Sequence, residues 1–154
     1  MTDAMLDQVA PKFSLLDQHG NQHSLQDYQG DWCVIYFYPK DDTPGCTKQA
    51  CNLRDNYSAL TEKNIKIIGI SVDTQQKHQQ FVDKYQLPFP LLSDVKGGIA
   101  KQYKCLFSLG PIKFAKRHSF LIDPSGTIRA IFRSVQADQH SQQILASFQR
   151  LTLS

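Results

Sequence analysis

The chain has 154 residues and a net charge of +3, with 41% hydrophobic and 20% charged residues, which is typical of a folded globular protein. Its basic residues are spread along the sequence and no apolar run approaches the ~20 residues of a membrane span, so we expect neither nucleic acid nor a membrane as partner. The first ten residues lack the apolar stretch of a signal peptide. We therefore expect a cytoplasmic protein with a single domain over residues 1–154, whose four cysteines indicate catalysis or metal binding rather than a disulfide framework.

Strand and helix patterns alternate through the first half of the chain. Two short strand-like segments flank a turn cluster and predict an N-terminal β-hairpin. A continuous apolar run fits a strand buried on both faces, as in a parallel sheet, and Pro39 ends it. Beyond the Pro44-Gly45 turn, apolar residues recur at helical spacing. The predicted elements are, in chain order, strands 13–16 and 22–25, strand 32–38, a helix from Cys46 to Leu60, and strand 65–72.

The second half continues with helices and ends with a pair of strands and a last helix. Pro124-Ser125-Gly126 forms a tight turn between two strand patterns. The predicted elements are a helix from Asp73 with His78, Phe81, Val82 and Tyr85 on its inner face, a short strand at 91–92, a short helix around Ile99 and Tyr103, strands 118–123 and 128–132, and a C-terminal helix with Ile144, Leu145, Phe148 and Leu151 on its apolar face. This order predicts an α/β fold with a central mixed β-sheet flanked by helices.

Cys46 stands where a buried strand has ended and a helix begins. Backbone N–H groups at a helix start lack intrahelical partners, and the helix dipole favours an anion there, so a thiol in this position loses its proton readily. Thr43 lies three residues upstream, where its hydroxyl can bind a thiolate or a substrate oxygen, and Gly45 lets a small molecule approach the backbone. Cys46 is therefore a candidate nucleophile, and the competing interpretation is a buried free cysteine that packs as a small hydrophobe.

Cys51, five residues later, adds a geometric constraint. In an intact helix, residues 46 and 51 are ~140° apart around the axis and ~7.5 Å apart along it. Their Cα atoms are then about 8.6 Å apart, beyond the ~7 Å limit for a disulfide bond. A bond between the two requires the first helical turns to unwind, which suits a reactive thiol and a second thiol that resolves it. Metal binding by the pair lacks support, because the five histidines are scattered and there is no Cys-x-x-Cys motif.

Three further residues allow more than one interpretation. Cys33 lies inside the apolar strand and is predicted to be a core residue. Cys105 follows a polar stretch near a loop and is an alternative candidate for the resolving thiol. Arg117, taken alone, fits a surface ion-pair residue, but a cation beside Cys46 would favour the thiolate.

The segment Pro39-x-x-x-Thr43-x-x-Cys46 resembles the signature of the peroxiredoxins. Thr43-Pro44-Gly45-Cys46-Thr47, followed by Ala50-Cys51, is similar to the peroxiredoxin Q branch, also called bacterioferritin comigratory protein. The resemblance extends over most of the chain. Further matching blocks are Ala10-Pro11-Lys12-Phe13, Leu53-Arg54-Asp55, Gly69-Ile70-Ser71-Val72-Asp73, Leu91-Leu92-Ser93-Asp94 and Arg117-His118-Ser119-Phe120-Leu121-Ile122-Asp123.

The resemblance implies a thioredoxin-like fold and a thiol-dependent peroxidase that reduces hydrogen peroxide and organic hydroperoxides. By position, Cys46 is then the peroxidatic cysteine and Cys51 the resolving cysteine, joined after turnover by an intramolecular disulfide that thioredoxin reduces. Thr43 and Arg117 bind the thiolate and the peroxide, and Pro39 shields the pocket. The resemblance implies neither a cofactor nor a metal ion.

Two alternatives remain at the level of sequence. One is a thiol–disulfide oxidoreductase on the same fold, although that chemistry normally uses the missing Cys-x-x-Cys motif. The other is a non-enzymatic redox-sensing or holdase module. Residues 104–116 look shorter than the corresponding loop in some relatives, so peroxide preference and dimer contacts are the least transferable features. Because an intramolecular disulfide needs no partner subunit, we expect a monomer or a weak homodimer.

Overall fold

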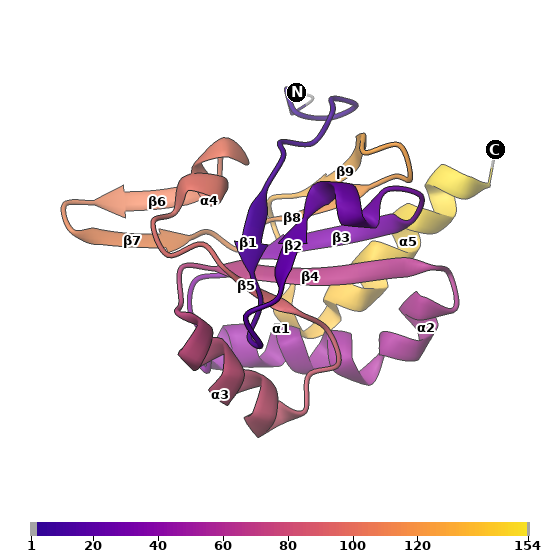
Figure 1. Cartoon of the computed structure of the whole chain (residues 1–154). Helices are drawn as coiled ribbons and strands as arrows, with labels where there is room; N and C mark the ends of the chain where they lie inside the picture. The colour runs from indigo at the N-terminus through magenta and orange to yellow at the C-terminus, as the bar shows by residue number, and fades with distance from the viewer. Residues whose placement is uncertain (1–2, 154) are drawn as a thin grey trace.

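A five-stranded mixed sheet lies at the centre of the protein, as a computed structural model that describes residues 3–153 shows (Figure 1). The strand order is β5-β4-β3-β8-β9, in which β3 pairs in parallel with β4 and antiparallel with β8. The strands are β3 (Trp32–Phe37), β4 (Ile65–Ser71), β5 (Leu91–Ser93), β8 (Ser119–Ile122) and β9 (Ile128–Phe132). The central mixed sheet predicted from the sequence is confirmed.

Two hydrophobic clusters cover the two faces of this sheet, because successive residues of a strand point to opposite sides. On β3, Cys33, Ile35 and Phe37 enter one cluster, whereas Val34 and Tyr36 enter the other. The second cluster is covered by α1 (Pro44–Asp55), α2 (Tyr57–Thr61), α3 (Gln75–Tyr85) and α5 (His140–Thr152). The first is covered by η1 (Leu25–Tyr28), α4 (Gly98–Gln102) and the segment before Ser14. Within residues 3–153, no helix is long and apolar enough to cross a membrane.

Two antiparallel hairpins lie outside the main sheet. The predicted N-terminal hairpin is present as β1 (Ser14–Leu16) and β2 (Gln22–Ser24). A second hairpin, β6 (Leu106–Leu109) and β7 (Ile112–Ala115), projects from the body at the left of Figure 1 and was not predicted. Phe107 and Phe114 stack across this hairpin with ring centroids 4.6 Å apart, so side-chain pairing stabilises it away from the core.

The helix predicted from Cys46 to Leu60 is in fact two helices. It begins two residues earlier, at Pro44, and is interrupted at Asn56, whose φ and ψ of −109° and 16° are not helical. Asn56 uses its amide to bond the carbonyl oxygen of Asn52 at 2.8 Å. Leu53 and Leu60 are both buried on either side of the break, which is why apolar periodicity alone did not reveal it.

Candidate active site

The turn from β3 into α1 places Cys46 in the first turn of a helix. Thr43 is the N-cap residue in extended conformation and Pro44 occupies the first helical position, so Cys46 is the third residue of α1 rather than its first. Pro44 has no N–H group, and the N–H of Thr47 already donates to the carbonyl of Thr43 at 2.8 Å. The amides of Gly45 and Cys46 therefore remain as the first-turn donors without an intrahelical acceptor, beside a thiol that is only 2% exposed.

Arg117, which lies just before β8, contacts Cys46. Its Nη2 group donates to the Cys46 Sγ at 3.4 Å, and its Nη1 group donates to the Gln49 Oε1 at 2.7 Å. A guanidinium at this distance stabilises a thiolate. Two of the residues singled out in the sequence are thus brought together although 71 positions separate them.

Gln49 is a site residue that the sequence analysis missed. It lies one helical turn after Cys46, is completely buried, and accepts the hydrogen bond that orients Arg117. Its Nε2 atom has no hydrogen-bond partner among the described residues. A polar residue at the apolar spacing of an amphipathic helix was the available indication of this role.

Gly45 allows a close approach by Arg117. A Cβ atom built at Gly45 would lie 2.8 Å from Arg117 Nη2, which is closer than side chains tolerate. Its backbone φ is not in the left-handed region, so the glycine is required by space and not by conformation. The group that approaches the Gly45 backbone in this structure is the Arg117 guanidinium, where the sequence predicts a small molecule.

Thr43 and Pro39 border the site in a less direct way. The Thr43 hydroxyl donates to the carbonyl of Lys40 at 2.8 Å, so its hydrogen is engaged within the loop and is not directed to the Cys46 sulfur. Pro39 is half-buried and lines a hollow of about 480 Å³ together with Ile112 and Phe114 of the β6–β7 hairpin. The unpredicted hairpin therefore forms one wall beside the loop that carries Thr43.

A buried polar cluster anchors this loop to the rest of the fold. Asp41 accepts from His78 Nδ1 at 2.6 Å and from the Tyr38 hydroxyl at 2.5 Å, while its own N–H donates to Asp73 at 2.8 Å. His78 Nε2 faces the Leu92 carbonyl at 3.0 Å and must therefore carry a hydrogen.

The same cluster has the residue types of a metal site. One ligand atom each of Asp41, Asp73 and His78 lies within 4.8 Å of the others. These atoms are already paired within the protein, since the Oδ2 atom of Asp73 also accepts from Ser71 at 2.6 Å. We interpret the cluster as a support for the loop, because its ligand atoms are hydrogen-bonded to one another and to the loop backbone.

The next residue of the loop is held on its outer side. Asp42 adopts a left-handed conformation with φ of 59°, which is uncommon for a residue with a side chain. Its carboxylate accepts from the Lys84 ammonium at 2.8 Å and from the Tyr85 hydroxyl at 3.0 Å, both on α3. Helix α3 thus fixes two consecutive residues of the loop in front of Cys46.

Cys51 lies further along the same helix and is half-buried. All four cysteines of the chain are free. Because Cys46 and Cys51 both belong to α1, the separation derived for an intact helix applies, and the two sulfurs cannot bond in this conformation.

Comparison with known proteins agrees with the geometry. The model of the AhpC/TSA family matches residues 6–131. A protein named putative peroxiredoxin Bcp, from Coxiella burnetii, is 42% identical over 142 residues, which cover 90% of this chain and 94% of that protein. The chain belongs to the AhpC/TSA family. It is a peroxiredoxin of the Q/Bcp type, and hence an oxidoreductase that acts as a thiol peroxidase.

Solved structures of this type share the fold. The peroxidoxin BcpB of Mycobacterium tuberculosis has a TM-score of 0.90 with 31% identity and matches 99% of this chain and 100% of its own. The bacterioferritin comigratory protein of Xanthomonas campestris, described for its alkyl peroxide reduction activity, has a TM-score of 0.84 with 29% identity and coverages of 90% and 91%. The thioredoxin-like peroxiredoxin fold inferred from the sequence is thereby confirmed.

The other two cysteines of this peroxiredoxin lie on the opposite face of the sheet. Cys33 and Cys105 belong to the cluster covered by η1 and α4, whereas Cys46 belongs to the cluster covered by α1. Burial raises the pKa of Cys105 to about 12 and raises that of Cys33 further, so both remain protonated. The prediction of a core role for Cys33 is confirmed. Cys105, the alternative resolving thiol, is buried on the face of the sheet opposite Cys46.

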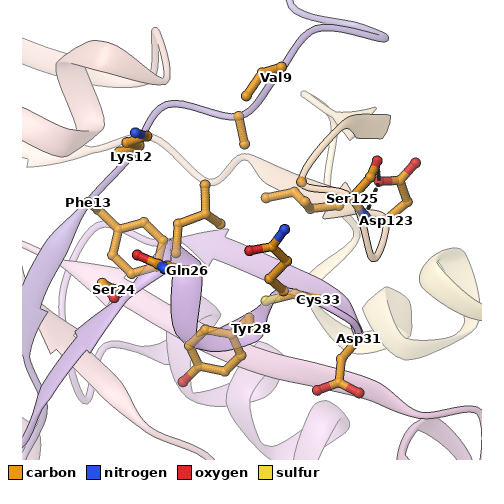
Figure 2. A pocket seen from close by; sticks show the side chains of 15 residues that line it. Val9, Lys12, Phe13, Ser24, Gln26, Tyr28, Asp31, Cys33, Asp123 and Ser125 are labelled. Carbon is orange, nitrogen blue, oxygen red and sulfur yellow. Dashed lines mark hydrogen bonds between the residues drawn. The ribbon is translucent and has the colours of Figure 1, made fainter.

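A hollow of about 380 Å³ opens next to Cys33 and not next to Cys46. Figure 2 shows the Cys33 sulfur among the lining side chains, which include Phe13 and Tyr28. A protonated, buried thiol is a poor nucleophile. This hollow is therefore not a candidate for the reactive centre.

A buried histidine lies behind Arg117. His140 is fully buried, and its two ring nitrogens lie 2.7 Å from the Ser119 hydroxyl and 3.0 Å from Gln143 Oε1. Burial, together with the positive charge of Arg117, lowers the pKa of His140 to about 4. The imidazole is therefore neutral near pH 7, with Nδ1 donating to Gln143 and Nε2 accepting from Ser119.

Proposed function

We propose that this enzyme is a two-cysteine peroxidase in which Cys46 reduces a hydroperoxide and Cys51 then resolves the oxidised product. The observation that carries the proposal is the hydrogen bond from Arg117 to the Cys46 sulfur at a helix start. A buried thiolate needs such a cation and such free amides in order to persist, and an inert core thiol needs neither.

In the first step, the Cys46 thiolate attacks the terminal oxygen of the hydroperoxide. An S–O bond forms, the O–O bond breaks, and the leaving oxygen takes up a proton to become water or an alcohol. Negative charge builds on that oxygen in the transition state. Arg117 and the amides of Gly45 and Cys46 are the donors that can stabilise it, and the Thr43 oxygen is available to orient the peroxide.

In the second step, the Cys51 thiolate attacks the sulfur of the Cys46 sulfenic acid. An S–S bond forms and the hydroxyl group leaves as water after taking a proton. The two cysteines belong to an intact helix, so this step requires α1 to unwind locally. An external dithiol, which we propose to be thioredoxin, returns the disulfide to two thiols.

Several finer assignments accompany this proposal. Pro39 shields the approach to the site, since it lines the adjoining hollow. An intramolecular disulfide requires no second subunit, which supports a monomer or a weak homodimer. Four free cysteines suit a reducing compartment, which supports the cytoplasm.

Steady-state turnover with hydrogen peroxide and an alkyl hydroperoxide, driven by thioredoxin and its reductase, tests the proposal. We expect Cys46→Ser to abolish turnover, and Cys51→Ser to consume about one peroxide per chain and then stall. Peptide mapping of the oxidised wild type should recover a Cys46–Cys51 disulfide within one chain. Full activity of Cys46→Ser would refute the assignment. Oxidation without turnover would favour a redox sensor, and disulfide reduction faster than peroxide reduction would favour a thiol–disulfide oxidoreductase.

A further inference from the structure

One side chain ties the segment that carries Cys51 to a different helix. Asn52 follows Cys51 directly on α1, and its Nδ2 group donates to the Asp138 carbonyl at 3.0 Å and to Gln142 Oε1 at 3.3 Å. Its Oδ1 atom accepts from the N–H of Ser141 at 2.8 Å. Every one of these partners belongs to η2 (Ala137–Gln139) or to the first turn of α5.

The contact with Ser141 supplies a helix cap from outside the helix. The first N–H groups of a helix have no intrahelical acceptor, and the residue at the N-cap of α5, Gln139, makes no side-chain capping bond. Asn52 provides the missing acceptor. Ser141 is fully buried, and α5 is fixed to the sheet by Ile144 in the core, so Asn52 is bonded to a rigid partner.

Unwinding of α1 and these bonds are mutually exclusive. Cys51 must leave its helical position to reach the Cys46 sulfur, and Asn52 is its immediate neighbour in the chain. Helix α1 lies against both η2 and α5 along this stretch, and Figure 1 shows α1 and α5 on the same side of the sheet. The side chain of Asn52 therefore has to release α5 before the disulfide can form.

We propose that Asn52 is a positioning residue that holds Cys51 away from Cys46 and thereby sets the rate of the resolving step. The inference rests on the proposed two-cysteine function. Asn52 touches neither the Cys46 sulfur nor Arg117 among its hydrogen-bond partners, so it acts on the second step and leaves the attack on peroxide unchanged.

The test compares Asn52→Ala with the parent enzyme in rapid-quench experiments with one equivalent of hydrogen peroxide. Loss of a capping side chain corresponds to roughly a fivefold change in an opening equilibrium. We therefore expect disulfide formation about fivefold faster, an unchanged rate of Cys46 oxidation, and faster amide exchange over α1. Excess peroxide should leave a smaller fraction of Cys46 as sulfinic acid, because the sulfenic acid is exposed for a shorter time.

Two further variants separate this effect from a general loss of stability. Thr74→Ala removes the cap of α3, where Thr74 Oγ1 accepts from the Lys77 amide at 3.3 Å, and should not accelerate the disulfide. Asn52→Asp keeps the acceptor for the Ser141 amide but loses the Nδ2 donor to Asp138 and Gln142, so its resolving rate should fall between those of Asn52→Ala and the parent.

The outcomes are distinguishable. An Asn52→Ala enzyme that resolves at the parent rate or more slowly overturns the role of Asn52, and so does equal acceleration by Thr74→Ala. Absence of a Cys46–Cys51 disulfide in the parent enzyme refutes the proposed function instead, whatever the Asn52 variants do.

Discussion

At the scale of single residues, the position of Arg117 depends on two neighbours on α1. Gln49 accepts one of its hydrogen bonds, and Gly45 leaves the space that its guanidinium occupies. Neither residue reacts with peroxide, yet both determine where the positive charge lies relative to the Cys46 sulfur. The placement of the guanidinium therefore depends on the Gln49 side chain and on the absence of one at Gly45.

The variant Gly45→Ala should separate activity from stability. The added methyl group meets the mobile end of Arg117 at 2.8 Å, and the guanidinium can move aside at little cost to folding. Its displacement from Cys46 should lower kcat/KM for peroxide by about 10- to 100-fold, while the free energy of unfolding changes by less than about 1 kcal/mol. Peroxide kinetics and urea unfolding measure the two quantities. Wild-type kinetics in this variant would mean that Arg117 does not act from the position described.

The motifs that resemble the family include Cys46 and Arg117, and the structure places these two side chains in contact. Gln49 was missed because a glutamine in a helix usually faces solvent. Only the fold shows that it is fully buried and bonded to Arg117, which lies just before β8. The Thr43 hydroxyl was expected at the thiolate and instead bonds to Lys40, because loop geometry decides which acceptor is nearest.

At the scale of elements, α3 serves as the anchor for the loop that precedes the active-site helix. The bond between His78 and Asp41 is buried on both sides, with side-chain exposures of 0% and 5%. His78 was predicted on the inner face of its helix, but its partner lies 37 residues away in sequence, and no pattern within either segment points to the other. Pairings of this kind depend on tertiary structure.

Replacing His78 with alanine should destabilise the protein strongly. The change leaves the Asp41 carboxylate buried without its imidazole partner, and breaking a buried pair from one side costs about 3–5 kcal/mol. Urea unfolding monitored by circular dichroism measures this difference. His19→Ala, at an exposed position, is the matched control and should change stability by less than about 0.5 kcal/mol. If His78→Ala lowered the free energy of unfolding no more than His19→Ala does, the His78–Asp41 pair would not be what holds the loop.

The stability of the junction between α5 and β8 should depend on pH through His140. The pKa of this residue is about 4 in the folded protein and close to 6.5 when unfolded, so the unfolded chain binds more protons between these values. The contribution of His140 to the free energy of unfolding is therefore fully present above pH 6.5. About 3 kcal/mol of it is lost as the pH decreases towards 4. Unfolding free energies of the parent and of His140→Asn, measured from pH 7 to pH 4, provide the test. An identical slope in both proteins would contradict the prediction.

Two elements show why boundaries were harder to predict than the elements themselves. The break at Asn56 preserves the burial of Leu53 and Leu60, so the apolar pattern continues across it. The β6–β7 hairpin contributes little to the core, and Leu109 and Ile112 at its tip are 67% and 56% exposed. Burial is the property that sequence patterns report, and a hairpin held by its own cross-strand pairs lacks it.

At the scale of the whole molecule, the central sheet divides the thiols into two groups. Cys46 and Cys51 belong to the helix on one face, whereas Cys33 and Cys105 are buried on the other. The alternation of side chains along β3 places Cys33 on the face away from α1, whereas the position of Cys105 after α4 depends on the tertiary fold.

The double variant Cys33→Ala/Cys105→Ala should retain peroxidase turnover within about twofold of the parent, because protonated core thiols do not take part in the chemistry. Its thermal midpoint should fall, since each substitution leaves a small void in the core. Turnover with a dithiol reductant and a thermal melt are the two measurements. Loss of the Cys46–Cys51 disulfide in this variant would assign a redox role to one of the buried thiols.

The division of the thiols also limits how many electrons one molecule can deliver. Four thiols represent two pairs of reducing equivalents in principle, but Cys33 and Cys105 are buried and protonated on the face opposite Cys46. Without a reductant, each chain should therefore discharge a single two-electron equivalent and then stop, with two of its thiols still available to a reagent after denaturation. Each chain therefore reduces one peroxide per reduction cycle, and the rate at which an external reductant restores the two thiols limits sustained turnover.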